Sequence, residues 1–214
     1  MSSTSPPRRA YDAPRRREQA AATRQAVLAR ARELFEREGY PATSVTAIAE
    51  AAQVTPRTVY LGFETKAGLL RAVWNRAHRG EHDGTPVADH RWFQEVLNEP
   101  DSERTLRLNA RNSRRFKERS TKLLQVVRDA APLEPAIAEL WGRIQVEYHA
   151  NQLAVVRSLG QGALRPGLGE RRAADIIWSL NHPNTWIQLS VLRGWTPAQY
   201  ERWVGDTSCQ QLLA

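Results

Sequence analysis

The residues of this chain best suited to chemistry form one short polar run, residues 55–60 (TPRTVY). An arginine fork can bind guanine or phosphate, and the hydroxyls of threonine and tyrosine can bind phosphate. Thr55 followed by Pro56 is typical of a helix start, because the hydroxyl caps free N–H groups and proline has no N–H to leave unsatisfied. The run therefore predicts polar side chains near the N-terminus of a helix, on its exposed side: Thr55, Arg57, Thr58 and Tyr60.

A second short helix is expected just before this run. Thr43 or Ser44 can cap it. It would turn four apolar residues inward: Val45, Ile48, Ala49 and Ala52. A break at residues 53–54 then separates the two helices. Two short helices joined in this way are typical of a helix-turn-helix, whose second helix enters the major groove of DNA. An ordinary helical hairpin with a solvated polar face is the alternative.

Helical periodicity extends over the rest of the chain and predicts an all-α fold. A helix is expected over 18–38, ending at Gly39, and the helix that begins at Pro56 is expected to end at Gly62. Other helices are expected over 66–79, 91–98, 102–116, 121–130, 134–160, 171–181, 183–192 and 197–212. No stretch alternates as a β-strand would for more than a few residues.

Charge indicates an anionic partner at the N-terminal end. The chain has a formal net charge of +8, and residues 1–71 carry +5 of it. Residues 1–17 combine Ser, Pro and Arg without apolar periodicity, so we expect a flexible basic arm. Its residues Arg15, Arg16 and Arg17 could follow the DNA backbone or enter a minor groove. A solvated tail without function is the alternative.

Several classes of protein are not favoured. No apolar run approaches the ~18–20 residues that span a bilayer, and no signal peptide is visible. The single cysteine, Cys209, fits a reducing cytoplasm. No nucleophile–base pattern suggests catalysis, and no cofactor is expected.

His78, His82, Asp83 and His90 lie around a glycine-containing stretch, which predicts a solvated connector rather than a metal site. The basic run 111–119 predicts a solvated helix face.

The amino-acid sequence of residues 24–74 is similar to the DNA-binding domain of TetR-family transcriptional regulators. The matching elements are Glu33-Leu34-Phe35, Gly39-Tyr40, Thr43-Ser44-Val45, Ile48-Ala49, Val54-Thr55, Thr58-Val59-Tyr60, Phe63, Lys66 and Leu69-Leu70. The resemblance implies an all-helical homodimer that binds a near-palindromic operator and usually represses. It implies an arm over 1–20, a helix-turn-helix domain over 21–66 and an effector-binding and dimerisation domain over 67–214.

The resemblance also implies roles for single residues. Thr43 or Ser44 would touch phosphate, as would Tyr60, and Lys66 would anchor the DNA backbone. Arg57 and Thr58 would face bases. Two positions depart from the family pattern. Gln53 stands where glycine is common in the turn, which implies a little strain. Gly62 stands where a histidine or aromatic residue often contacts DNA.

The C-terminal part offers aromatic candidates for further sites. Its positions Trp178, Trp186 and Gly194-Trp195 are similar to those in a subset of the same family. An aromatic-rich helical domain suits an apolar or aromatic ligand, although large indoles are more often core or interface. We expect an effector pocket at Trp141, Tyr148 and Trp178. A subunit interface is expected at Trp186, Leu189 and Val191.

The sequence therefore predicts a ligand-responsive regulator that binds double-stranded DNA as a homodimer and responds to a small-molecule effector, without a membrane partner. One alternative is a DNA-binding regulator without a small-molecule ligand, controlled by a protein partner. Another is a small metal- or ligand-binding enzyme in which the hairpin is only structural.

Overall fold

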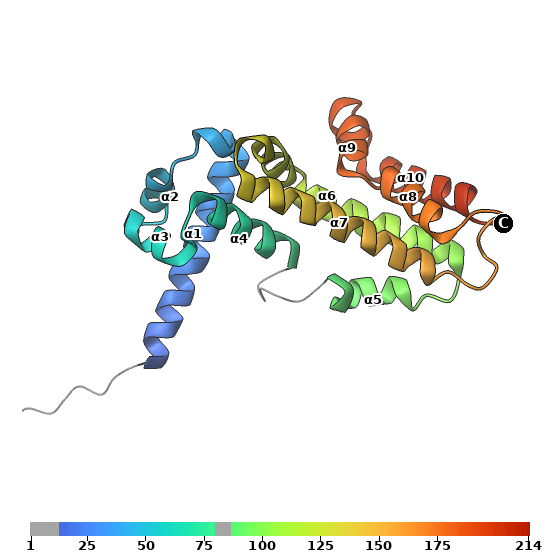
Figure 1. The fold of residues 1–214 in the computed structure, drawn as a ribbon, viewed down its shortest axis with the longest axis horizontal. Helices are drawn as coiled ribbons and strands as arrows, with labels where there is room; N and C mark the ends of the chain where they lie inside the picture. Colours follow the sequence, from blue (N-terminus) through green and yellow to red (C-terminus); the bar gives the residue numbers. More distant parts are fainter. Residues whose placement is uncertain (1–12, 80–86) are drawn as a thin grey trace, which may run out of the picture.

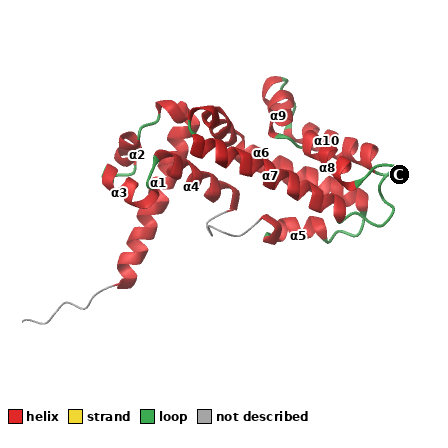
Figure 2. Cartoon of the chain, viewed as in Figure 1, coloured by secondary structure: helices red, strands yellow, loops and turns green. Residues whose placement is uncertain are grey.

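The protein is an elongated assembly of helices, seen here in a computed structural model that describes residues 13–79 and 87–214 (Figures 1 and 2). The described residues include no strand; one isolated bridge joins Leu164 and Leu213. Nor do they include a helix long and apolar enough to cross a membrane. The helices are α1 (Ala13–Ala42), α2 (Val45–Ala51), α3 (Pro56–Phe63), α4 (Lys66–Arg79), α5 (Arg91–Leu97), α6 (Ser102–Ala130), α7 (Pro135–Arg157), α8 (Glu170–Leu180), α9 (Pro183–Trp186) and α10 (Pro197–Leu212). Two short 3-10 helices, η1 (Val87–Asp89) and η2 (Ala131–Leu133), and one π-helix, η3 (Ile187–Leu192), lie between them.

The first helix is longer than expected at its N-terminal end. It begins at Ala13, so residues 13–20 of the expected arm are helical, and residues 1–12 lie outside the described part. The sequence there is rich in Arg, Gln and Ala, which are good helix formers, and this propensity overrides the lack of an apolar stripe. Near the other end, Gly39 has φ +78° and interrupts the helical path, which confirms it as the break before Tyr40 and Pro41.

The two short helices form as predicted, around a strained turn. Ser44 caps α2 and Thr55 caps α3 through their side-chain oxygens. Gln53 has φ +56°, the left-handed conformation that glycine adopts most easily. α3 continues through Gly62 to Phe63, because the chain leaves the helix only at Glu64, where φ is +64°.

The middle of the chain holds one long helix where two were expected. α6 runs without interruption from Ser102 to Ala130. The expected gap, residues 117–120, holds neither glycine nor proline and therefore nothing that must break a helix. Lys117 and Ser120 are instead buried on the inner side of α6.

One hydrophobic cluster joins the N-terminal helices to α6 and α7, and two further clusters lie among α5 to α10. Buried residues of α1 and α4, such as Phe35 and Trp74, belong to the same cluster as Leu123 of α6 and Ile137 of α7. Figure 1 shows α6 and α7 running side by side away from α1–α4, with α8 and α10 beside their far ends. α6 and α7 are therefore packed directly against α1 and α4.

Candidate nucleic-acid interface and internal cavity

The turn between α2 and α3 is held by local hydrogen bonds. Ser44 Oγ accepts from the Ala47 amide at 3.0 Å, and Thr55 Oγ1 accepts from the Thr58 amide at 3.2 Å. The Val54 amide donates to the Ala49 carbonyl at 2.9 Å, across the turn. These bonds fix the start of α3 relative to α2.

α3 turns its apolar residues inward and its polar residues outward. Val59 and Phe63 are buried, whereas Arg57, Thr58 and Tyr60 are exposed, as the spacing predicted. Arg57 forms no ion pair with any residue in 13–79 or 87–214, so its guanidinium stays available to an outside partner. The exposed side of α3 therefore carries a guanidinium group and two hydroxyl groups that can bind base edges and phosphates.

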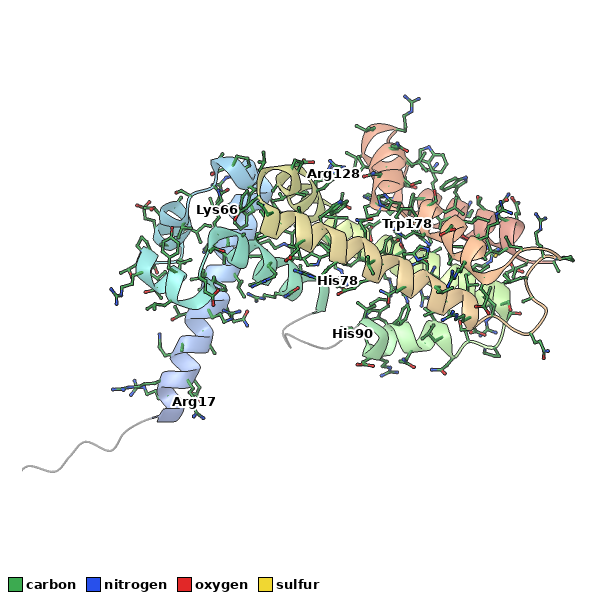
Figure 3. All side chains as sticks on the ribbon, in the orientation of Figure 1. Arg17, Lys66, His78, His90, Arg128 and Trp178 are labelled. Atoms are coloured by element: carbon green, nitrogen blue, oxygen red, sulfur yellow. The ribbon has the colours of Figure 1, made fainter. Side chains whose placement is uncertain are left out.

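Arginines on the first turns of α1 extend this polar surface. Arg15, Arg16 and Arg17 are exposed, and Figure 3 shows Arg17 on the part of α1 that projects beyond the other helices. They are carried by a helix and not by a flexible arm, which corrects the sequence-based expectation. Arg16 lines a groove together with Thr58 and Leu61 of α3. Arg16 thus stands beside α3.

Thr43 does not belong to this surface. Only 1% of it is exposed, and its hydroxyl donates to the Gly39 carbonyl at 2.7 Å. It therefore ties the end of α1 to the start of α2, and the expected contact of Thr43 with phosphate is wrong. Its neighbour Ser44 is exposed and remains at the N-terminus of α2.

A residue that the sequence did not single out connects α1 to the end of α3. Arg24 donates from Nη1 to the Gly62 carbonyl at 3.0 Å, and its guanidinium lies 4.4 Å from the centre of the Phe63 ring. A side chain at position 62 would meet no heavy atom within 4 Å, so Gly62 leaves open space at the surface. No local pattern in the sequence predicts these contacts of Arg24, since its partners lie 38 and 39 positions away.

Lys66 is held against the protein rather than extended toward solvent. Its ammonium lies 4.2 Å from the centre of the Tyr40 ring, and partial burial lowers its pKa while the carboxylate of Glu134 opposes that shift. The Tyr40 hydroxyl in turn donates to Glu134, which stands directly before α7. Lys66 is thus linked to α7 as well as to the candidate interface.

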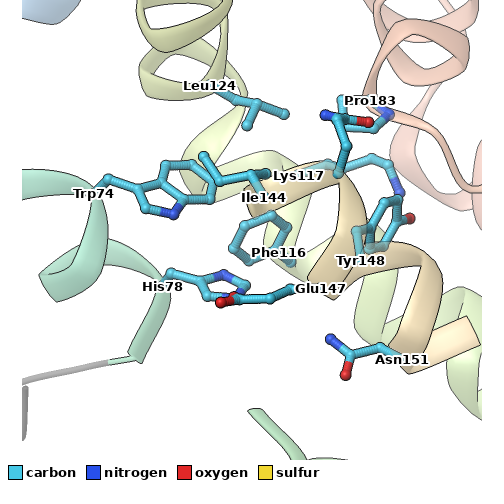
Figure 4. Close-up of a pocket in the computed structure, with 11 residues that line it drawn as sticks. Trp74, His78, Phe116, Lys117, Leu124, Ile144, Glu147, Tyr148, Asn151 and Pro183 are labelled. Atoms are coloured by element: carbon cyan, nitrogen blue, oxygen red, sulfur yellow. The ribbon is translucent and has the colours of Figure 1, made fainter. Parts of the chain in front are cut away.

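A narrow internal cavity of about 30 Å³ lies between α4, α6 and α7 (Figure 4). Aromatic rings form one side of it: His78 stacks on Trp74 at 5.4 Å, and Phe116 meets both edge-on. Other residues that line it are Lys117, Leu124, Ile144, Glu147, Tyr148 and Pro183.

The polar side of this cavity is formed by Lys117 and Tyr148. The Lys117 ammonium donates to Ser113 Oγ, and the Tyr148 hydroxyl donates to the Asn181 carbonyl. Burial lowers the pKa of Lys117 to about 7 and raises the pKa of Tyr148. No pattern in the sequence indicates that Lys117 is buried, and the expected solvated face over 111–119 is wrong at this residue.

Of the three residues expected in an effector pocket, only Tyr148 lines this cavity. Trp141 packs against the core shared by α1, α4 and α6. Trp178 lies edge-on to His182, 4.9 Å between ring centres. Both indoles pack against other side chains and lie outside this cavity, so a role for them in effector binding stays a prediction.

Trp186 is not at a subunit surface. It is 6% exposed and packs edge-on against Tyr200 at 4.9 Å, which corrects its expected place in an interface. Leu189 is half-buried against the same cluster. Val191 is 59% exposed. Of the three, only Val191 offers a largely free apolar side chain.

The described residues hold no group of acidic, histidine or cysteine side chains that could bind a metal ion. His78 is engaged with Trp74 and Phe116, and His90 lies 6.1 Å from the ring of Trp92. His82 and Asp83 lie outside the described residues.

Residues 27–73 match a protein-family model described as bacterial regulatory proteins, tetR family. A search of curated proteins found no match. Among solved structures, NalD of Pseudomonas aeruginosa, the secondary repressor of the MexAB-OprM multidrug efflux pump, is similar with a TM-score of 0.70. The identity is 21%, over 91% of this chain and 98% of NalD.

Two further solved structures contain ligands. SmeT in complex with triclosan is similar with a TM-score of 0.71 and 19% identity, over 90% of this chain and 92% of SmeT. A putative transcriptional regulator from Saccharomonospora viridis in complex with choline gives a TM-score of 0.70 and 17% identity, over 91% and 99% of the two chains. At these identities the likeness shows a common fold.

Proposed function

Since the N-terminal domain of this chain belongs to the tetR family of bacterial regulatory proteins, we propose that the chain represses transcription as a homodimer bound to a near-palindromic operator, and that a small effector releases it from DNA. The observation that carries the proposal is the exposed face of α3. There Arg57 has no described ion-pair partner and Thr58 and Tyr60 stand beside it.

Each proposed DNA contact has a distinct role. Arg57 and Thr58 read base edges, and Thr55 orders the start of α3 through its cap on Thr58. Tyr60 and Ser44 bind phosphate, the latter at a helix N-terminus whose free N–H groups favour anions. Lys66 binds phosphate from its place beside Tyr40, and the arginines of α1 add contacts with the DNA backbone.

The cavity between α4, α6 and α7 is the proposed effector site. Trp74 and His78 of α4 form part of its wall, and α4 begins at Lys66 beside the DNA-binding surface. An effector that parts α4 from α6 would therefore shift the two recognition helices of the dimer. Successive major grooves are about 34–36 Å apart, so such a shift weakens operator binding. The complexes of SmeT with triclosan and of the S. viridis protein with choline support a small-molecule effector.

The proposed dimer would use the exposed end of the C-terminal part. Val191 and the half-buried Leu189 lie in η3, in the segment that projects from the body in Figure 1. A second copy would cover this apolar surface and place two α3 helices on one side of the DNA.

The test is binding to DNA that flanks the protein's own gene, measured by fluorescence anisotropy over a salt series. We expect a specific complex with a steep salt slope, because phosphate contacts release counterions. Arg57→Ala should weaken operator binding by about 1–3 kcal/mol and relax sequence preference. Arg91→Ala, an exposed arginine of α5 paired with Glu95, is the matched control. Equal behaviour of Arg57→Ala and Arg91→Ala would contradict the assignment of α3 as the recognition helix.

A further inference from the structure

The cavity contains a buried cation without an acidic partner. Lys117 is 2% exposed, and its ammonium donates to Ser113 Oγ and lies 5.4 Å from the centre of the Tyr200 ring. Within residues 13–79 and 87–214, no carboxylate lies within ion-pair distance of it. A buried charge normally has a partner of opposite sign, because desolvation strongly disfavours an isolated ion.

The groups that surround Lys117 do not supply the missing negative charge. Burial raises the pKa of Tyr148 and of Tyr200, so both hydroxyls stay neutral. Burial, Lys117 and Arg128 lower the pKa of His182, so its ring is neutral at pH 7. The pKa of Lys117 itself is lowered by desolvation, without a contribution from any carboxylate. An anion next to Lys117 would therefore be stabilised and would restore the charge of the ammonium.

The other side of the cavity suits a flat apolar body. Trp74, Phe116 and Ile144 line it, and Figure 4 shows the carboxylate of Glu147 at the His78 side while the Lys117 ammonium lies beside Tyr148. Glu147 is exposed to solvent, whereas Lys117 is not. The buried end of the cavity thus carries the Lys117 ammonium, and the carboxylate of Glu147 lies at the solvated end.

We infer that the effector is a small aromatic acid, whose ring lies among Trp74, Phe116 and Ile144 and whose anionic group pairs with the Lys117 ammonium. The inference rests on the proposed effector site and names the class of its ligand. A free volume of about 30 Å³ has room for little more than water, so the ring enters by displacing these side chains. Entry of the ligand and movement of α4 against α6 are then one event.

A cationic ligand is the competing class, because aromatic faces and Glu147 could hold an ammonium group. The buried ammonium counts against it, because a cation deep in the cavity would be repelled by Lys117.

The experiment compares three head groups on the same ring, using benzoate, benzamide and benzylamine, followed by 2-naphthoate and its amide and methylamine analogues. Binding is followed by calorimetry and by fluorescence, since Trp74 lines the cavity. We expect each acid to bind at least about tenfold more tightly than its amide, and the amines to bind most weakly. Between pH 7 and pH 8 the affinity for the acid should fall about fivefold, with proton uptake, because Lys117 must be charged in the complex.

Lys117→Met removes the charge and keeps an unbranched apolar stem. It should abolish both the preference for acids and the pH dependence, while Lys122→Met, at an exposed position of α6, should retain them. The three-way comparison on the unaltered protein needs no variant to fold. The inference is overturned if amides or amines bind as tightly as acids, if no acid binds, or if Lys117→Met keeps the preference. Release of operator DNA by neutral or cationic compounds alone would overturn it and leave the proposed effector site standing.

Discussion

The hydroxyl of Tyr40 donates a hydrogen bond to the carboxylate of Glu134, which joins the end of α1 to the start of α7 across 94 positions of sequence. The Lys66 ammonium lies over the Tyr40 ring, so three elements meet at one phenol. Burial and Glu134 both raise the pKa of Tyr40, which keeps the hydroxyl protonated as the donor. Since Lys66 begins α4 beside the proposed DNA-binding surface, this contact links that surface to α7, which lines the cavity.

We predict that Tyr40 and Glu134 are energetically coupled. In a double-mutant cycle of Tyr40→Phe and Glu134→Gln, urea unfolding should give a coupling free energy of about 1–2 kcal/mol, as expected for a hydrogen bond to a charged group. Glu139→Gln, on the exposed side of α7, replaces Glu134→Gln in the control cycle and should give no coupling. Strictly additive effects of Tyr40→Phe and Glu134→Gln on the free energy of unfolding would mean that this hydrogen bond does not couple α1 to α7.

Thr43 and Ser44, adjacent in sequence, should respond differently to substitution. Thr43→Val keeps the shape but removes the buried hydroxyl, so it should lower the free energy of unfolding by about 1–2 kcal/mol and leave the salt slope of operator binding unchanged. Ser44→Ala should lower stability by about 1 kcal/mol through loss of the cap, and should also reduce operator affinity. A reduced salt slope for Thr43→Val would restore Thr43 to the interface.

Replacement of Arg15, Arg16 and Arg17 by alanine should weaken binding to all DNA sequences alike. If each arginine neutralises one phosphate, the slope of log affinity against log salt should fall by up to about 2.7. Alanine is a good helix former, so α1 should keep its length, which circular dichroism would check. An unchanged slope would mean that these three arginines do not contact DNA phosphates.

Gln53→Gly should stabilise the protein. Gln53 has φ +56°, and a residue with a Cβ in the left-handed region is destabilised by roughly 1–2 kcal/mol. Glycine relieves this strain but is more flexible in the unfolded chain, so the expected net gain in thermal or urea unfolding is about 1 kcal/mol. Gln53→Ala shares the strain and serves as the control. Equal stability of the two variants would show that the turn is not strained.

Lys117→Met should stabilise the protein at neutral and acid pH. The pKa of Lys117 falls from 10.5 to about 7 on folding, so the unfolded state binds more protons between these values and stability rises with pH there. The desolvation penalty is complete below pH 7, where the variant should gain about 2–4 kcal/mol, and the gain should vanish near pH 10. Urea unfolding of Lys117→Met and Lys122→Met at pH 6 and pH 10 gives the comparison. A gain that does not depend on pH would argue against a buried amine.

The helices and their starts could be predicted from sequence because they depend on neighbours a few positions apart. Thr55-Pro56 marks the start of α3, and Gly39 marks the break in α1. Prediction failed at residues 117–120, which lie between the two expected helices over 102–116 and 121–130. A buried lysine and serine continue the inner side of α6 there, and a local apolar pattern does not record such burial.

By itself, the sequence determined the all-helical fold, the α2–α3 unit and the exposed polar side of α3, since caps, breaks and periodicity are local properties. Only the tertiary structure decided that Thr43 and Trp186 are buried and that Tyr148, rather than Trp141 or Trp178, lines the cavity. It also decided that Tyr40 contacts Glu134, and that the buried Lys117 has no carboxylate partner among the described residues. The physical reason is that burial and pairing depend on which helices pack together, and residues far apart in the chain meet only in the folded protein.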